Sequence, residues 1–168
     1  MIIFSKIWLG LFLFVSFLFI YSCSKDSSSS PTEIGNNNNK LTAQISGSMT
    51  KSFNAIQTVY IYQAIGSEMS QSVITGYEGN QNQSDNIMLQ LINLVDGAQT
   101  IDLGLGLGTL MYVKYNNGSA QQYLATEGTV NITQNDSKSI KGTFSAKIGT
   151  VGTSTYIEIN NGSFCCDK

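Results

Sequence analysis

Residues 140–148 read Ile-Lys-Gly-Thr-Phe-Ser-Ala-Lys-Ile, and this stretch decides the fold that we expect for the chain. Apolar or small residues stand at the even positions, and Lys, Thr or Ser stand at the odd positions. Successive side chains of a β-strand point to opposite faces. The alternation therefore predicts a strand with one face in a core and the other in water.

The same period of two recurs from Leu41 onward. The expected strands are Leu41–Ser48, Val59–Ala64, Val73–Tyr77, Ile87–Leu94, Thr100–Leu103, Leu110–Tyr115, Gln122–Ala125, Thr129–Thr133, Ile140–Ile148 and two short strands near the C-terminal end, the first around Ile157–Ile159. About ten short strands in one domain predict an all-β fold, either an antiparallel β-sandwich or a closed β-barrel. The pattern alone does not choose between these two architectures.

Polar segments between the expected strands have the composition of turns. Asn116–Ser119 is expected to be a hairpin loop, and Gln134–Ser137 and Gly149–Ser154 are expected to be further turns. Asn161-Gly162 lies between the last two short strands and predicts a tight turn there, because Asn-Gly adopts the positive φ angles that such turns require.

The N-terminal residues have the features of a lipoprotein signal peptide over residues 1–22. A single Lys6 precedes an apolar run, Ile7–Ile20, which is shorter than the roughly 20 residues needed to cross a bilayer. The alternative is an uncleaved N-terminal membrane anchor. Ile20-Tyr21-Ser22-Cys23 resembles a bacterial lipobox, in which the Cys23 thiolate takes up a lipid and the peptidase cuts before it. The sequence therefore predicts a mature protein whose Cys23 carries acyl chains such as palmitate.

Residues 23–40 follow as a Ser- and Asn-rich segment, which we expect to be a disordered tether because it has too few apolar residues to form a core. Residues 41–168 form the expected single β-domain. This organisation predicts attachment to the outer membrane of the cell envelope through the lipid on Cys23. The domain would lie on the periplasmic or the cell-surface side, and the sequence leaves that choice open.

The composition limits the partners that the domain can have. All nine basic residues are lysines, the net charge is −2, and charged residues make up 12% of the chain. A nucleic-acid-binding protein would show a basic face, so no nucleic-acid partner is expected. The absence of His removes Ser-His-Asp and Cys-His arrangements, and neither a cofactor nor a metal site is expected.

Three segments in the second half resemble a family of small Bacteroidota lipoproteins with a β-rich domain of unknown function. The segments are residues 123–133, which end in Asn-Ile-Thr, residues 140–146 with Gly-Thr-Phe, and residues 159–164 with Asn-Gly-Ser-Phe. The resemblance implies a lipobox, a polar spacer and a β-domain. It implies no catalytic residues, since the shared positions are turn glycines and core aromatics.

Few side chains are candidates for chemistry. Gly104, Gly106 and Gly108 lack the third glycine and the following helix of a dinucleotide loop, so we interpret them as a bend between strands. Cys165 and Cys166 are adjacent and are expected either to remain a free pair at the end of a strand or to form a vicinal disulfide. The acidic side chains are scattered and are expected to be solvated: Glu68, Glu78, Asp85, Asp96, Asp102, Glu127, Asp136 and Glu158.

Tyrosines are numerous for a domain of this size. Tyr60, Tyr62 and Tyr112 are candidates for stacking on a sugar ring or on a protein partner, and core packing is the alternative. The function expected from the sequence is non-catalytic binding or scaffolding at the envelope, with a protein or glycan partner. A carrier of a small hydrophobic ligand and, less favoured, a glycan hydrolase are the alternatives.

Overall fold

The computed structural model describes residues 39–65, 67–81, 83–150 and 156–168, all of which fall in one compact unit, Asn36–Lys168. The elements are β1 (Lys40–Gly47), β2 (Lys51–Asn54), β3 (Gln57–Ile65), β4 (Met69–Tyr77), β5 (Asn86–Ile92), β6 (Gln99–Asp102), the 3-10 turn η1 (Leu103–Leu105), β7 (Gly108–Asn116), β8 (Ser119–Asn135), β9 (Ser139–Gly149) and β10 (Tyr156–Asp167). The predicted all-β class is confirmed.

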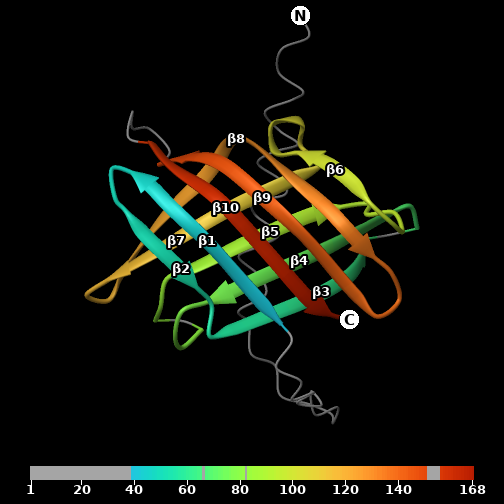
Figure 1. Ribbon diagram of the computed structural model, residues 1–168, viewed down its shortest axis with the longest axis horizontal. Helices are drawn as coiled ribbons and strands as arrows, with labels where there is room; N and C mark the ends of the chain where they lie inside the picture. The colour runs from blue at the N-terminus through green and yellow to red at the C-terminus, as the bar shows by residue number, and fades with distance from the viewer. Residues whose placement is uncertain (1–38, 66, 82, 151–155) are drawn as a thin grey trace, which may run out of the picture. The chain divides into compact units, whose positions relative to one another are not determined.

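The strands belong to one antiparallel sheet with the order β2-β1-β10-β9-β8-β7-β5-β4-β3, and β6 pairs with β8 off this path. In Figure 1, β1, β10 and β9 cross over β7, β5 and β4, so the sheet curls over itself into a half-barrel. Among the described residues, the edge strands β2 and β3 each pair with a single neighbour. The architecture therefore lies between the two alternatives: one sheet forms both layers, and its edges do not join.

The sheet changes layer along β8, which is a single bent strand. Its first residues pair with β7 up to Leu124, and its remainder pairs with β9. The register shifts between Ala125 and Glu127, and Gly128 follows with φ +146°. A Cβ atom at Gly128 would lie 2.4 Å from the Ser145 carbonyl oxygen, so the strands approach too closely here for a side chain. The two strands predicted at Gln122–Ala125 and Thr129–Thr133 are therefore one.

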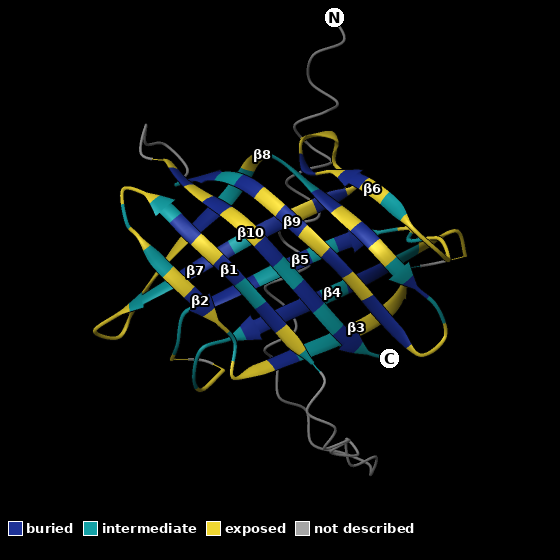
Figure 2. Cartoon of the chain, viewed as in Figure 1, coloured by how far each residue is buried: buried dark blue, intermediate teal, exposed yellow. Residues whose placement is uncertain are grey.

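The concave face of the sheet encloses the core. Burial alternates along the strands as the sequence predicted, most regularly in β9 (Figure 2). The fully buried side chains include Leu41, Ile45, Phe53, Ile74, Ile87, Leu89, Leu91, Leu110, Tyr112, Ile140, Ile148 and Ile157. Leu89 and Leu91 have 0% exposed area, so water can contact them neither from the solvent nor from a cavity inside the domain. The core is filled at these positions.

The two Asn-Gly pairs have different structures. Asn117 and Gly118 have φ +48° and +83° and connect β7 to β8, which confirms the predicted hairpin loop. Asn161 has a similar φ of +50°, but it lies inside β10 at a β-bulge, where the register shifts between Ile159 and Gly162. The predicted tight turn at Asn161-Gly162 is wrong, because β10 is hydrogen-bonded on both sides and continues through the bulge.

The remaining turn predictions fall near β9. Gln134–Ser137 overlaps the connection between β8 and β9, which confirms a turn there. Gly149–Ser154 begins at the last residue of β9, and its residues 151–154 lie outside the described residues. In the part of the chain that the structure describes, no helix is long and apolar enough to cross a membrane.

Candidate functional site

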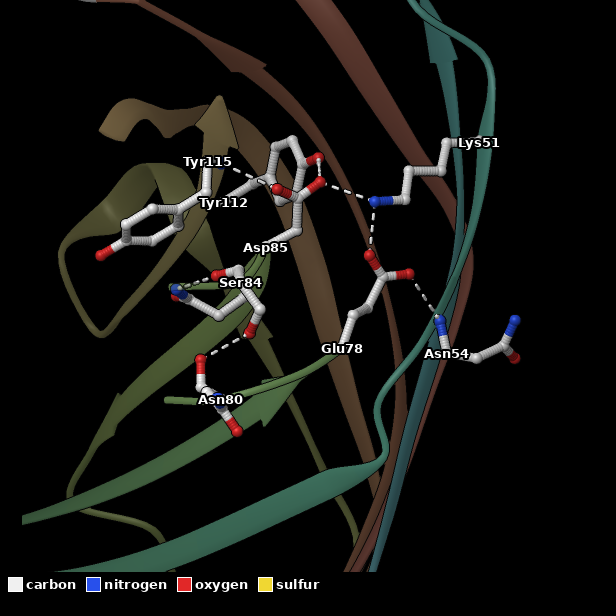
Figure 3. A network of polar contacts seen from close by, with 9 residues as sticks. Lys51, Asn54, Glu78, Asn80, Ser84, Asp85, Tyr112 and Tyr115 are labelled. Atoms are coloured by element: carbon white, nitrogen blue, oxygen red, sulfur yellow. Dashed lines mark hydrogen bonds and ion pairs between the residues drawn. The ribbon is translucent and has the colours of Figure 1, made fainter. Parts of the chain in front are cut away.

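The most closely connected polar side chains lie where β2 meets the loop between β4 and β5 (Figure 3). Lys51 Nζ lies 2.6 Å from Asp85 Oδ2 and forms a second ion pair with Glu78. Asp85 Oδ2 also accepts a hydrogen bond from the Tyr112 hydroxyl at 2.7 Å, and its Oδ1 accepts one from the Tyr115 backbone N–H at 2.8 Å. We call these five residues the Lys51 corner.

The loop between β4 and β5 presents the two carboxylates on the same side. The Glu78 N–H donates to the Asp85 carbonyl at 3.0 Å, which brings the two ends of the loop together. Inside the loop, the Ser84 hydroxyl donates to the Asn80 carbonyl at 2.9 Å. Glu78 Oε1 accepts a hydrogen bond from the Asn54 backbone N–H at 3.2 Å, so the loop also holds the end of β2.

The electrostatics of the corner favour its charged form. Burial of Asp85 raises its carboxyl pKa, but the hydrogen bonds from Lys51, Tyr115 and Tyr112 outweigh burial and lower the pKa below its usual value. Burial likewise lowers the pKa of Lys51, and the two carboxylates outweigh it and raise that pKa. Burial and the bond to Asp85 raise the pKa of Tyr112, so its hydroxyl remains a donor.

The Lys51 corner connects β2, the loop between β4 and β5, and β7. The carboxylate oxygens of the corner are occupied by these contacts. Both oxygens of Asp85 accept hydrogen bonds, and only 13% of its side chain is exposed. A general acid on a glycosidase would instead need a carboxyl whose pKa is raised.

The prediction that Glu78 and Asp85 are solvated is wrong. Nothing in the sequence pairs them with Lys51, which is 34 residues from Asp85, although Lys51 is the single charged residue between Lys40 and Glu68.

The three candidate tyrosines do not share one surface. Tyr112 has 0% exposure, stacks on Tyr123 with ring centroids 5.8 Å apart and belongs to the Lys51 corner, so its ring is not available to a ligand. Tyr60 is half-buried and shares a hydrogen bond of 3.2 Å with Ser72. Tyr62 is 62% exposed. Of the three, the structure leaves Tyr62 free to meet a partner.

The two adjacent cysteines point to opposite sides of β10. Cys166 has 0% exposure and packs in the core, where burial raises its pKa to about 12, whereas Cys165 lies on the outer face and is half-buried. Both thiols are free. Because consecutive side chains alternate along a strand, a disulfide between them would require β10 to leave its extended conformation. Cys23, the predicted lipidation site, lies outside the described residues.

The outer face of β8, β9 and β10 is polar, and its middle carries uncharged Ser, Thr and Asn side chains. A row of paired residues runs across five strands through Thr42, Ser163, Thr143, Asn131 and Thr100. An open depression of about 440 Å³ lies on this face and is lined by Asn131, Thr143, Phe144, Ser145, Asn161, Gly162 and Ser163. Thr42 and Ser163 bond to each other at 2.9 Å, as do Thr100 and Asn131, so we interpret the row as a solvated face.

A second open depression, of about 450 Å³, lies at the turn between β8 and β9 and is lined by Gln134, Asp136, Lys138, Ser139, Lys141, Cys165 and Asp167. Asp136 accepts bonds from the Gln134 side chain and from the Lys138 and Ser139 N–H groups, which lower its pKa to about 2. These bonds form the turn itself. Within the described residues, no three Cys, Asp or Glu side chains are grouped to hold a metal ion.

The second half of β3 exposes large apolar side chains at an edge of the sheet. Ile61 and Tyr62 are 55% and 62% exposed, and Met69 at the start of the adjacent β4 is 51% exposed. The sequence has no charged residue from Ser52 to Ser67. Long, apolar and uncharged edges are rare on soluble proteins, because their free backbone groups can pair with another strand. We call residues Tyr60–Ile65 the open edge.

Comparison of the chain with models of known protein families, with curated proteins and with solved structures finds no match. The resemblance to small Bacteroidota lipoproteins therefore stays a prediction.

Proposed function

We propose that this chain is a lipid-anchored, non-catalytic binding module of the cell envelope, and that it binds a polypeptide partner along the open edge. The observation that carries the proposal is the exposure of Ile61 and Tyr62 on an edge strand that contains no charged residue of its own. Free N–H and C=O groups on such an edge recognise an extended polypeptide through backbone hydrogen bonds, and the side chains add specificity.

The filled interior supports binding at the surface over transport within a cavity. A carrier of a small hydrophobic ligand needs an enclosed space of several hundred cubic ångströms. Leu89 and Leu91, which would line that space, have 0% exposed area, and Phe144 has 3%. Both surface depressions are open and are lined mainly by polar residues.

The Lys51 corner supports a non-catalytic role. Its two carboxylates, Glu78 and Asp85, both form ion pairs with Lys51. The anchoring part of the proposal depends on Cys23. Each buried methylene of an acyl chain contributes about 0.8 kcal/mol to membrane binding, so two or more chains would hold a domain of this size durably.

The proposal is tested by affinity capture of the tagged full-length protein from detergent-solubilised membranes. The wild type is compared with Ile61→Lys on the open edge and with Thr143→Lys, a matched charge on the solvated outer face. We expect the wild type and Thr143→Lys to retain the same bound polypeptide and Ile61→Lys to lose it. Equal capture by all three proteins would contradict binding at the open edge.

The anchor is tested separately with Cys23→Ala. This substitution removes the thiol that accepts the lipid, so we expect uncleaved precursor that does not incorporate labelled palmitate. Processing and membrane attachment equal to those of the wild type would contradict the predicted lipidation.

A further inference from the structure

The outward side chains of β3, β4, β5, β7 and the first part of β8 form an uncharged and largely apolar face. Their inward neighbours belong to the core, so the outward positions are the odd-numbered residues of β3, β4 and β7 and the even-numbered residues of β5 and β8. One row of directly paired residues crosses all five strands, and one pair from the next row adjoins it. The row is Val59, Thr75, Met88, Met111 and Leu124, and the adjoining pair is Ile61 and Val73. We call these seven residues the apolar outer face.

The apolar outer face is open over a wide area. Its five strands span about 20 Å, because neighbouring strands lie about 4.8 Å apart. Ile61 is 55% exposed, and the other apolar members are half-buried. All ten strands belong to one sheet, so in the described part of the chain no second layer covers this face. Apolar patches of more than a few hundred Å² usually mark a contact with a protein or with a membrane.

The charged side chains of the domain lie elsewhere. Lys141, Lys147 and Glu158 point outward from β9 and β10. The Lys51 corner closes the β2 edge, where Glu78 accepts the Asn54 N–H. In contrast, no outward side chain of β3, β4, β5, β7 or the first part of β8 is charged. The domain therefore has one side suited to water and one side suited to an apolar medium.

The shape of the apolar outer face limits what can cover it. The core lies on the concave side of the curled sheet, so this face is convex, and in Figure 1 it belongs to the layer behind β1, β10 and β9. A convex face offers no groove to a helix or a peptide. Two convex faces touch along a narrow strip, which falls short of the area that a stable dimer buries. Fluid acyl chains, in contrast, conform to a convex apolar surface.

We propose that the apolar outer face contacts a lipid surface, with Met88 and Met111 at the centre of the contact. Both side chains are flexible thioethers that adapt to irregular surroundings. β4, β5 and β7 are hydrogen-bonded to strands on both sides, so the centre of the face brings no free backbone group to the lipid. Tyr77 and Tyr115 point to the same side of the sheet at the end next to the Lys51 corner, and phenol rings suit the boundary between lipid and water.

The free backbone groups of β3 do not face the lipid. The Thr58 carbonyl accepts a hydrogen bond from the Asn39 side chain at 3.4 Å, which places the backbone groups of Thr58 on the side away from β4. In an antiparallel pair, the N–H and C=O of alternate residues point to the same side. The backbone groups of Tyr60, Tyr62 and Ala64 therefore also point away from β4, in the plane of the sheet. They stay open to a polypeptide, so the lipid contact goes beyond the proposed function and does not compete with it.

The test is tryptophan quenching in the full-length protein, reconstituted in phosphatidylcholine vesicles with or without bromine on the acyl chains. Met111→Trp reports on the apolar outer face, and Thr143→Trp on the polar outer face is the matched control. The single natural tryptophan, Trp8, precedes the domain, and its signal is subtracted with the unsubstituted protein. We expect bromine to quench Met111→Trp at least about twofold more than Thr143→Trp, because a face that enters about 5–10 Å into the lipid boundary reaches the acyl chains.

A second substitution tests whether the apolar character of the face produces the contact. Met88 pairs directly with Met111, so adding Met88→Lys to Met111→Trp should reduce quenching to the level of Thr143→Trp. Adding Thr143→Lys instead should leave quenching unchanged. Val73→Trp, on the same face of β4, is measured in parallel and replaces Met111→Trp if that variant does not fold. Quenching should be the same at about 0.1 M and 1 M salt, because no charge takes part in the contact.

Equal quenching at both tryptophan positions, or no effect of Met88→Lys, would overturn the lipid contact. Loss of quenching at high salt would also overturn it, because the contact would then depend on charged side chains elsewhere. A blue-shifted emission of Met111→Trp without quenching would mean that a protein, including a second copy of this chain, covers the face in place of lipid. These readouts use residues of the folded domain and do not depend on lipidation at Cys23 or on capture at Ile61, so the lipid contact and the proposed function can fail separately.

Discussion

The two edges of the sheet differ in how their backbone groups are protected. β2 is short, begins with Lys51 and is held by Glu78 and Asp85, whose own polar atoms are satisfied. β3 is longer and uncharged, and it exposes Ile61 and Tyr62. Natural sheets generally protect edges with charge, short length or a covering segment. Among the described residues, one edge has all three devices and the other has none beyond Tyr60, which is why we propose binding at the second.

The largest expected effect comes from breaking the closed edge with Asp85→Ala. This change leaves the Tyr112 hydroxyl and the Tyr115 N–H without their acceptor and removes one of the two partners of Lys51. We expect the free energy of unfolding to fall by about 2–4 kcal/mol in urea denaturation. The control is Glu127→Ala, because Glu127 is 67% exposed and pairs with Lys147 at 3.4 Å; its loss should stay within about 0.5 kcal/mol. Similar losses of unfolding free energy in both variants would show that the Lys51 corner does not stabilise the β2 edge.

A pair of proline substitutions tests which groups of β3 are free. Ile61→Pro removes an N–H that points to β4, whereas Tyr62→Pro removes one that points to the open side. Each is compared with alanine at the same position to account for the lost side chain. We expect Ile61→Pro to unfold about 1–3 kcal/mol more easily than Ile61→Ala, and Tyr62→Pro to remain close to Tyr62→Ala. The opposite order would mean that the N–H of Tyr62 points to β4 and the N–H of Ile61 points to the open side.

The pH dependence of stability should also report on the closed edge. Folding lowers the pKa of Asp85. The stabilising contribution of this carboxylate is therefore fully present when the pH is above the pKa of the unfolded chain, near 3.8, and it is lost as the pH falls through the pKa of the folded protein. Folding raises the pKa of Lys51, which affects stability at alkaline pH. The stabilising contribution of this ammonium is present below pH 10.5 and is lost as the pH rises through the pKa of the folded protein. We expect stability, followed by urea midpoints, to decline on both sides. Asp85→Asn should flatten the acid side, and an unchanged acid slope would remove Asp85 as its cause.

The smallest effect on stability is expected at the open edge. Ile61→Lys places a charge on an exposed side chain, so the free energy of unfolding should change by no more than about 0.5 kcal/mol. Association should nevertheless be lost, and comparing urea midpoints with capture on the same samples separates the two effects. A large loss of stability would mean that Ile61 supports the fold of the isolated domain.

Local patterns predicted the strands well where neighbouring residues decide the outcome. The alternation in residues 140–148 lies within β9, and Asn117-Gly118 forms the expected hairpin turn. β2 was missed, because its four residues are too few to show a period. The same dipeptide at Asn161-Gly162 became a bulge, since β1 and β9 pair with β10 on both sides of it. A Cβ at Gly162 would lie 2.5 Å from the Phe144 ring, a contact between strands that no local pattern contains.

The sequence by itself determined the strand-forming character of the domain and the inward and outward faces of most strands, because both depend on residues next to one another. The lipobox at Cys23 is a prediction from adjacent residues of the same kind. The tertiary structure alone decided that one sheet curls into a half-barrel, that Tyr112 is buried and that Lys51 meets Glu78 and Asp85. It also decided that β3 is an edge strand. These features depend on which strands become neighbours, and that choice is made by the packing of the whole core.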